Sequence, residues 1–288
     1  MLNDLGAARA AIDYIESNLD RNLDLDTMAA QVKYSKYHLH RSFAQACGTT
    51  MGDYIARRRL TEAAKMLVLT DWPVLDIAVS VGFGGQQSFA AAFKRMYKKT
   101  PVQFRRDEEF YALQLRIALA DELTGKRLRR GASAETRFAT KEDVPAWMKL
   151  LSLVVDGYPH LDESEYAEHL KRSIESREAI VLERGTKIVS AIAFRRDLGT
   201  IEFLGVHPQM RGSGISKVLM RSALQELAPE VETVSTTTFR AEDAADTGYR
   251  EDLLALGFAE AEMLEEFGYP TQRLLAAKSV LKEACDAR

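Results

Sequence analysis

Two closely spaced glycines precede a predicted helix in the C-terminal half of the chain. The segment reads Leu204-Gly-Val-His-Pro-Gln209-Met-Arg-Gly212-Ser-Gly214-Ile-Ser-Lys217, a strand-like run followed by a glycine-containing loop and a helix start. The free N–H groups and the positive dipole end at a helix N-terminus attract anions, phosphate above all. The pattern therefore predicts a phosphate-binding loop, and a purely structural strand-to-helix turn is the alternative.

A second kind of chemistry is suggested by residues 73–106. A short apolar-periodic helix is followed by Gly82-Phe-Gly-Gly85, where glycine tolerates the positive φ of a tight turn. The next predicted helix carries basic residues toward its end and stops at Pro101. Two helices joined by such a turn are typical of a helix-turn-helix that reads the DNA major groove.

An earlier stretch repeats this unit. Ser35 is the expected N-cap of a helix at 36–46, and Gly48 ends it. Four side chains are expected near its exposed N-terminal side, where a recognition helix meets base edges: Tyr37, His38, His40 and Arg41. A long helix at 51–69 joins the two copies. Its Arg57-Arg58-Arg59 run is expected beside the DNA, with a merely solvated helix face as the alternative.

The remaining pattern divides the chain. Residues 5–19 predict an amphipathic helix, and Asp26 is the expected N-cap of the next one. Residues 108–123 predict a further helix, and the small, basic run at 125–135 predicts a linker. We therefore expect domains at 1–107 and 136–288, joined by a connecting helix and linker at 108–135.

The C-terminal half predicts alternating helices and strands. The expected strands are 137–140, 179–183, 188–195, 200–207, 232–239, 259–267 and 271–276. The expected helices are 141–155, 163–176, 215–227 and 249–256. This mixed order predicts an α+β domain around a largely antiparallel sheet.

Composition sets the outer bounds. Of the 288 residues, 46% are hydrophobic and 28% charged, as in globular chains with ordinary cores. No long apolar run or signal-peptide pattern is present, so we expect a cytoplasmic protein without a membrane partner. Cys47, Cys285 and five scattered histidines predict neither a disulfide framework nor a metal site. Residues 1–107 hold 15 Lys and Arg against 11 Asp and Glu, a balance that suits a nucleic-acid module joined to an acidic remainder.

Residues 8–106 resemble the DNA-binding domain of AraC/XylS transcription regulators, and most nearly its MarA/Rob-like branch. The matching motifs are YSKYHLHRSF, GDYIARRRLTEAAKML, DIAVSVGF and QQSFAAAFKRMYKKTPVQFRR. The resemblance implies an all-α tandem helix-turn-helix and double-stranded DNA as partner. It also implies that a monomer can place two recognition helices in successive major grooves, about 34 Å apart.

Roles follow from this resemblance position by position. Tyr37, His40 and Arg41 fall where the first recognition helix contacts bases, and Arg41 suits guanine. On the second recognition helix, where glutamine suits adenine, the corresponding residues are Gln86, Gln87 and Ser88. Phosphate contacts are implied for Arg57, Lys94 and Arg95. Ala91 stands where related proteins often have an arginine, so we expect weaker readout there.

Residues 136–277 resemble the GNAT acyltransferases, because Gln209-x-x-Gly212-x-Gly214 lies within a matching strand order. The resemblance implies acetyl-CoA or another acyl-CoA as ligand or co-substrate, and no metal. Pyrophosphate would lie on the loop and pantetheine along the preceding strand. The implied residues are Leu204, Val206, Gln209, Met210, Arg211, Gly212, Ser213, Gly214, Ile215, Ser216 and Lys217.

Catalytic residues are less well marked. The resemblance makes Glu202 a candidate base acting through water, with a solvated strand carboxylate as the alternative. The usual tyrosine acid lies four residues before the glycine of Leu256-Gly-Phe258, where this chain has Leu253, and Tyr249 is a possible substitute. The polar run at 239–249 and the segment 156–161 are expected to border the acceptor site.

Three functions fit these patterns. The C-terminal domain binds acyl-CoA or a small amine as effector of a regulator, or the chain is both regulator and working N-acetyltransferase, or it is a DNA-tethered enzyme acting on other DNA-bound proteins. The missing tyrosine favours the first, and the intact loop keeps the second open. We expect ligand occupancy to reach the DNA through the helix at 108–123.

Overall fold

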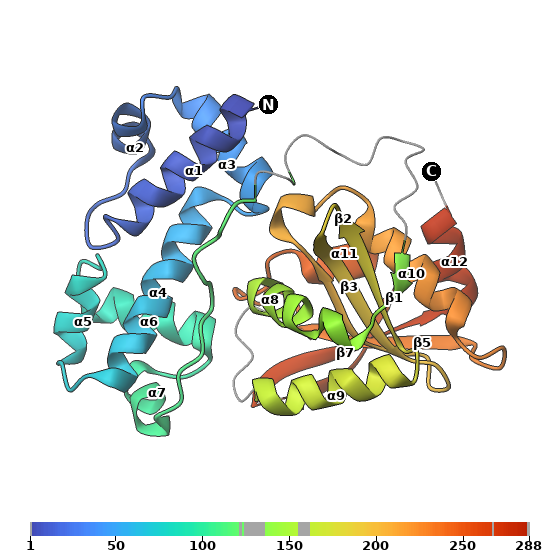
Figure 1. Cartoon of the computed structure of the whole chain (residues 1–288). Coiled ribbons are helices and arrows are strands. Elements are labelled where there is room, and N and C mark those ends of the chain that lie inside the picture. The colour runs from blue at the N-terminus through green and yellow to red at the C-terminus, as the bar shows by residue number, and fades with distance from the viewer. Residues whose placement is uncertain (1, 121–122, 124–135, 155–161, 267, 287–288) are drawn as a thin grey trace. The chain divides into compact units, whose positions relative to one another are not determined.

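The computed structural model describes residues 2–120, 123, 136–154, 162–266 and 268–286. These residues form two compact units, one before and one after the segment 124–135 (Figure 1). That segment and residues 155–161 lie outside the described residues, so the predicted linker and the predicted acceptor wall at 156–161 remain predictions.

The first unit is helical and has two halves joined by one long helix. The first half contains α1 (Leu2–Glu16), α2 (Leu25–Val32) and α3 (Lys36–Cys47). The second contains α5 (Val74–Ser80), α6 (Gln86–Tyr97) and α7 (Pro101–Asp107). The joining helix, α4 (Met51–Leu69), has the bounds that the sequence predicts. Figure 1 shows this arrangement of the unit in blue and green. The tandem helix-turn-helix fold is confirmed.

Local capping explains where these helices begin and end. Ser35 accepts a hydrogen bond from the His38 N–H, and Gly48 adopts φ 67° after α3, as predicted. The N-cap of α2 is Asp24 and not the predicted Asp26, because the Asp24 carboxylate accepts the Thr27 N–H at 2.8 Å.

The end of α6 also differs from the prediction. Lys98, at φ 60°, ends that helix, and Pro101 begins α7 behind the N-cap Thr100. A proline fits the first helical turn, since its missing N–H would have no partner there.

The expected helix at 108–123 is wrong for the described residues 108–120. Glu108 ends α7 with φ 56°, and residues 109–120 contain no helix. Leu113 and Ile117 have helical spacing, but both are buried in an extended segment. Contacts to the first unit replace the helical hydrogen bonds that the spacing suggested. We call residues 111–119 the strap.

The second unit is built on a seven-stranded sheet with the order β1-β2-β3-β4-β5-β7-β6. The strands are β1 (Thr136–Phe138), β2 (Ala179–Arg184), β3 (Lys187–Arg195), β4 (Thr200–Val206), β5 (Thr233–Phe239), β6 (Ala259–Glu266) and β7 (Tyr269–Ala277). All neighbouring pairs are antiparallel except β4 and β5. The predicted mixed, mainly antiparallel α+β fold is confirmed.

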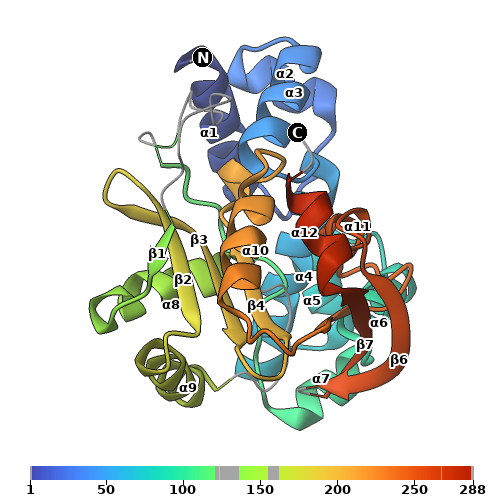
Figure 2. The same cartoon turned by 90° about the vertical axis from the view of Figure 1, so that its right-hand side faces the viewer.

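Helices cover both faces of this sheet. They are η2 (Lys141–Asp143), α8 (Val144–Val154), α9 (Glu163–Glu175), η3 (Pro208–Met210), α10 (Ile215–Glu226), α11 (Tyr249–Ala255) and α12 (Lys278–Asp286). Val181 and Ala191 pack with α8 and α9, while the alternating neighbours Ile180 and Ile192 are buried on the other face. Figure 2 shows α10 and α12 side by side. The sequence did not predict α12.

Candidate functional site

The outer face of α3 carries three of the predicted base-reading residues. Tyr37, His40 and Arg41 are exposed, and Tyr37 keeps 75% of its surface accessible. The Arg41 guanidinium lies 5.6 Å from the centre of the Tyr37 ring. This cation–π contact orients Arg41, which forms no ion pair with a described residue. Its N–H groups therefore stay available for a bidentate contact to guanine.

His38 lies on a different side of α3. Its Nδ1 is 3.6 Å from the Asp4 carboxylate of α1, and its ring is 5.4 Å from that of Tyr34. Ser42, one turn later, also hydrogen-bonds Asp4 at 3.3 Å. This side of α3 faces α1, so His38 packs within the first half, and its expected base contact stays a prediction.

The second recognition helix, α6, presents a more polar face. Gln86, Gln87 and Ser88 are exposed at its start, and Lys94 and Arg95 are exposed toward its end. The Ser88 hydroxyl donates to the Gly85 carbonyl at 2.9 Å, which leaves the two glutamines as its better base readers. Neither Lys94 nor Arg95 forms an ion pair with a residue that the structure describes.

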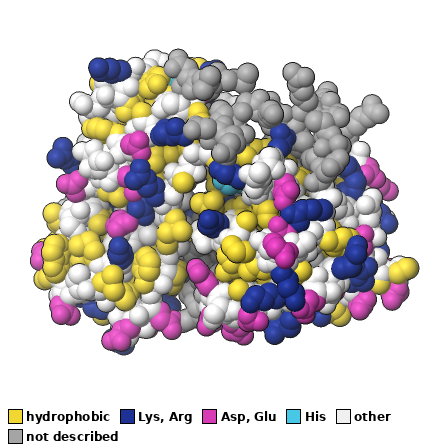
Figure 3. Space-filling view, in the orientation of Figure 1, with side chains coloured by type: hydrophobic (Ala, Val, Ile, Leu, Met, Phe, Trp, Pro, Cys, Tyr) yellow, Lys and Arg dark blue, Asp and Glu magenta, His cyan; other side chains and the backbone are white. Residues whose placement is uncertain are grey.

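The three successive arginines of α4 are buried or hydrogen-bonded within the first unit. This environment fits neither a DNA contact nor a solvated helix face, the two interpretations that the sequence suggested. Only 2% of Arg57 and 7% of Arg58 are exposed, so neither lies on a solvated face or can reach a phosphate in this fold. Arg59 is partly exposed, but its guanidinium donates to the carbonyls of Leu19 and Arg21. The burial of Arg57 argues against its expected phosphate contact. On the face drawn in Figure 3, the Lys and Arg side chains are dispersed among acidic and apolar ones.

The glycine loop of the second unit is shaped as an anion cradle. Gly212 and Gly214 adopt φ 67° and 84°, and a Cβ at either position would meet nothing within 4 Å. The space above the loop is therefore open. Hydrogen bonds to described residues engage none of five N–H groups in and just after this loop, those of Gly212, Gly214, Ile215, Ser216 and Lys217. Such a set of N–H groups at a helix start suits a phosphate.

The residues before the loop hold it in place. Met210 is buried, and its carbonyl accepts both the N–H and the hydroxyl of Ser213. The buried His207 accepts the Gln209 N–H through Nδ1 at 3.3 Å. Burial, together with the positive charges of Lys187 and Arg211, lowers the pKa of His207 to about 4. His207 is therefore neutral near pH 7, beside two cations that favour a bound anion.

The two basic side chains of the loop are used differently. The Lys217 ammonium donates to the Ala284 carbonyl of α12 at 3.1 Å, so Lys217 offers an anion its backbone N–H and not its side chain. Arg211 has no ion-pair partner in the described part of the chain and is the available cation.

Strands β4 and β5 separate after a short paired stretch. β4 and β5 pair only through Thr200–Ile201 and Ser235–Thr236. From Phe203 to Val206, β4 is paired with β3 on one edge only. This segment includes Leu204 and Val206, where pantetheine was expected, and its free edge offers the backbone groups that an amide-containing arm would pair with.

Glu202 is the extra residue of a β-bulge in β4. Ala193 pairs with Phe203 while Phe194 pairs with Ile201, so Glu202 has no partner in β3. Its carboxylate lies 3.0 Å from Nε2 of His169 on α9 and 3.9 Å from Arg195. Sequence reasoning missed His169, because 33 positions separate it from Glu202 and only the packing of α9 brings them together.

Tyr166, on the same helix, joins this cluster. Its hydroxyl accepts a hydrogen bond from the buried indole of Trp147 at 3.2 Å. Burial, together with the nearby Glu202 charge, raises the pKa of Tyr166 to about 12. Tyr166 therefore stays protonated at neutral pH.

The expected features around Tyr249 have other roles or stay untested. Leu253 is a buried apolar side chain, so this position has no hydroxyl that could act as the usual tyrosine acid does. Tyr249 lies at the start of α11, where its N–H donates to Asp246 at 2.9 Å. Within 239–249, Asp243 binds the Tyr269 hydroxyl and the Ala245 N–H, which braces this polar run internally.

The described residues contain neither a metal-binding group nor a membrane-spanning helix. No group of three or more His, Cys, Asp or Glu side chains there could hold a metal ion. None of the helices in this part of the chain is long and apolar enough to cross a membrane.

Comparisons with known proteins agree with this division. A family model described as "Helix-turn-helix domain" matches residues 28–107, and one described as "Acetyltransferase (GNAT) domain" matches residues 156–266.

Relatives match the first unit in particular. The Right origin-binding protein of Escherichia coli is 39% identical over 144 residues, which cover 50% of this chain and 47% of that protein. The chain thus spans about half the length of the first curated relatives that it matches. The probable transcription factor PqrA of Proteus vulgaris is 43% identical over 33% of this chain and 79% of its own. The regulatory protein SoxS of Escherichia coli is 39% identical over 33% and 88%. The chain belongs to the AraC-type helix-turn-helix family of these proteins, and residues 156–266 of its second unit match the GNAT acetyltransferase domain.

Proposed function

We propose that the protein is a transcription regulator that binds double-stranded DNA through α3 and α6 and senses an acyl-CoA through its second unit. The observation that carries this proposal is the open cradle at Gly212–Lys217, present in the same chain as two exposed recognition helices. A monomer suffices for two major-groove contacts, because both helices lie on one chain.

The names of relatives support the regulatory part. Proteins similar to the first unit are called a transcriptional regulator, a probable transcription factor and a regulatory protein. The helix-turn-helix family match at residues 28–107 covers α3 and α6, which contain the proposed base readers Tyr37, His40, Arg41, Gln86 and Gln87.

The ligand follows from the chemistry of the second unit. The N–H groups of Gly212–Lys217 and the Arg211 guanidinium would hold a pyrophosphate, and the free edge of β4 would hold the pantetheine amides. Acetyl-CoA combines these groups and is the first ligand to test. A small amine next to Glu202 would be a second effector.

Calorimetric titration with acetyl-CoA tests this proposal. In Gly212→Glu, a carboxylate enters the anion cradle, and we expect acetyl-CoA affinity to fall at least tenfold, a loss of about 1.4 kcal/mol. Gly185→Glu is the matched control, because Gly185 also has positive φ and open space but lies in the turn between β2 and β3. The sensor proposal fails if wild type binds no acetyl-CoA, or if the two variants bind it equally well.

The Glu202–His169 contact favours a second function, N-acetyl transfer. The amine nitrogen attacks the thioester carbon, the C–N bond forms and the C–S bond breaks. Glu202 and His169 receive the amine proton through water, and the thiolate takes a proton from solvent, since Leu253 offers none. A carboxylate paired with an imidazole is suited to this relay.

Turnover of acetyl-CoA with a panel of primary amines tests the enzymatic function. We expect Glu202→Gln and His169→Asn each to lower kcat by about 10²–10⁴-fold. Arg41→Ala, altered only in the first unit, should turn over as wild type does. If the protein binds acetyl-CoA but shows no turnover, the sensor proposal stands and the proposed N-acetyltransferase activity is refuted.

A further inference from the structure

The strap contacts both halves of the first unit. At the second half, the Tyr111 and Tyr97 hydroxyls each hydrogen-bond the other residue's carbonyl, at 3.4 and 3.3 Å. The Tyr111 ring also packs 5.1 Å from that of Tyr97 and 5.3 Å from that of Phe104. This end of the strap is anchored by aromatic packing.

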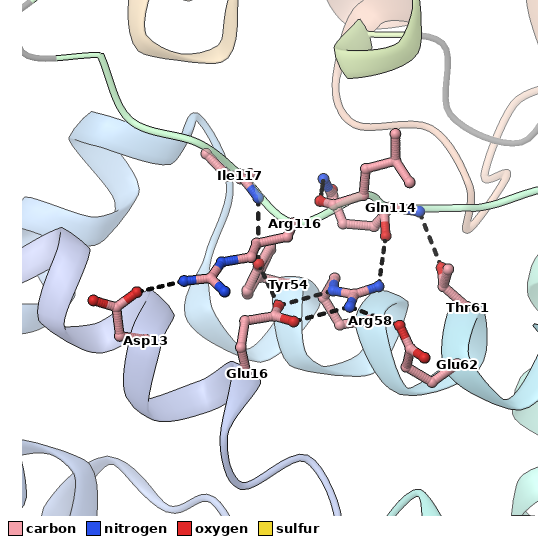
Figure 4. Close-up of polar contacts among 10 residues, drawn as sticks. Asp13, Glu16, Tyr54, Arg58, Thr61, Glu62, Gln114, Arg116 and Ile117 are labelled. Carbon is pink, nitrogen blue, oxygen red and sulfur yellow. Dashed lines mark hydrogen bonds and ion pairs between the residues drawn. The ribbon is translucent and has the colours of Figure 1, made fainter.

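The middle of the strap is bound to α4. The Gln114 N–H donates to the Thr61 hydroxyl at 3.1 Å, and the Gln114 carbonyl accepts from Arg58 at 3.1 Å. Figure 4 shows both bonds, with the strap running beside α4. The backbone of Gln114 is thus satisfied by side chains one turn apart on the joining helix.

The far end of the strap reaches the first half. The Ile117 N–H donates to the Tyr54 hydroxyl at 3.4 Å, and its side chain enters the core that contains Ile12 and Leu39. Arg116 pairs with Asp13 of α1 at 2.7 Å (Figure 4). The Leu119 carbonyl accepts a hydrogen bond from Arg9 of α1 at 3.2 Å.

Arg58 joins these parts through one buried side chain. It binds both carboxylate oxygens of Glu16 on α1 at 2.8 Å, and it also binds Glu62 and the Gln114 carbonyl. Burial disfavours the charge of Glu16, but hydrogen bonds from Arg58 and Tyr54 outweigh burial and lower the pKa of that carboxyl. The strap, α1 and α4 therefore share one ionised network (Figure 4).

A direct contact between the halves adds to the strap. A Cβ at Gly82, in the turn between α5 and α6, would lie 2.7 Å from the Leu19 carbonyl of the first half and 2.7 Å from the Arg59 guanidinium. The two recognition helices are thus tied by α4, by this contact and by the strap.

We propose that the strap is a spacing clamp: it holds α3 and α6 at one separation and so selects DNA sites by the distance between their two contacted segments. A rigid tie raises the effective concentration of the second contact once the first has formed, and a loose tie lowers it. The clamp rests on the DNA-binding part of the proposed function and adds a determinant of site choice outside both recognition helices.

The strap can be released in the full-length chain by Tyr111→Ala/Ile117→Asp. The matched control is Phe110→Ala/Leu115→Asp, which makes the same kind of change at exposed positions of the same stretch. Spin labels on Gln45→Cys and Ala91→Cys, exposed on α3 and α6, report the separation by pulsed electron resonance. We expect one narrow distance in wild type and control, and a broad distribution in the release variant.

DNA binding supplies the second measurement. A duplex selected from a random pool by wild type is compared with versions lengthened between the contacted segments by one base pair or by about five, half a helical turn. We expect the release variant to bind the selected duplex at least about tenfold more weakly and to lose most of its discrimination against the lengthened versions. The control variant should match wild type.

The outcomes separate the two ideas. Unchanged distance distribution and spacing preference in the release variant would overturn the clamp. If wild type selects no duplex, DNA binding fails as a function, and the spin-label distances still decide whether the strap fixes the separation. If the release variant does not fold, Thr61→Val, which removes the acceptor of the Gln114 N–H together with the hydroxyl that hydrogen-bonds Tyr97, should still broaden the distances, and a width equal to that of wild type would count against the clamp.

Discussion

The arginines of α4 and the basic residues of α3 and α6 belong to one unit but face opposite surroundings. Arg57 and Arg58 are buried, whereas Arg41, Lys94 and Arg95 are exposed without ion-pair partners among the described residues. A helix shared by two halves has neighbours around most of its circumference, so even a triple-arginine run there serves structure. A helix with one outward face keeps its cations for a partner.

Arg58→Ala should give the largest effect on the structural side of this comparison. It leaves the buried Glu16 carboxylate without its main partner, and we expect the free energy of unfolding of the first unit to fall by about 3–5 kcal/mol. Urea unfolding followed by circular dichroism measures this loss. Lys65→Ala, exposed on the same helix, should change stability by less than about 0.5 kcal/mol. Equal losses in Arg58→Ala and Lys65→Ala would show that the buried arginine of α4 contributes no more to stability than an exposed cation of the same helix.

Gly82→Ala tests the contact between halves in which Arg59 takes part. The new Cβ would meet the Leu19 carbonyl at a residue with φ 80°, so we expect a stability loss of about 1–3 kcal/mol in the same unfolding experiment. Gly84→Ala is the control, since its Cβ would meet nothing within 4 Å and its φ is not positive. A tolerated Gly82→Ala would mean that the halves are not in contact there.

Arg41→Ala should change specificity and leave stability intact. Loss of a bidentate base contact is expected to remove about 1–3 kcal/mol of discrimination at one base pair. Competition between duplexes that differ at each position of the selected site measures this. Arg106→Ala, exposed on α7, should leave the base preferences unchanged. If Arg41→Ala instead weakens all sequences equally, Arg41 is a phosphate contact.

Lys94→Ala should give the smallest effect. We expect affinity to drop by a similar factor on every sequence, and the slope of log K against log salt concentration to decrease by about 1. Titrations at several salt concentrations give both numbers, with Lys149→Ala in the second unit as the control. If Lys94→Ala changes the base preference, Lys94 contacts a base edge and not a phosphate.

The features that follow from local rules were predictable. Ser35, Gly48 and the bounds of α4 follow from capping and periodicity, and the succession of strands and helices along most of the second unit follows from its alternating runs. The strap and α12 were not predictable this way. The strap has helical spacing but satisfies its backbone through Arg58, Thr61 and Tyr54, and α12 follows β7 directly at Lys278 without a turn residue.

The candidate sites divide in the same manner. The glycine loop carries its chemistry in its backbone and can be recognised within a dozen consecutive residues. Burial of Arg57, the turn of His38 toward Asp4 and the meeting of His169 with Glu202 depend on neighbours distant in sequence. Such side-chain environments require the folded structure.

The two tryptophans of the chain fall one in each unit, and their surroundings give the protein a built-in optical label. Trp72 is 51% exposed, so its emission is that of an indole in water both before and after unfolding. Trp147 is fully buried, bonded to Tyr166 and 5.5 Å from Phe203, so its emission is blue-shifted only while the second unit is folded. A red shift of the fluorescence therefore reports unfolding of the second unit.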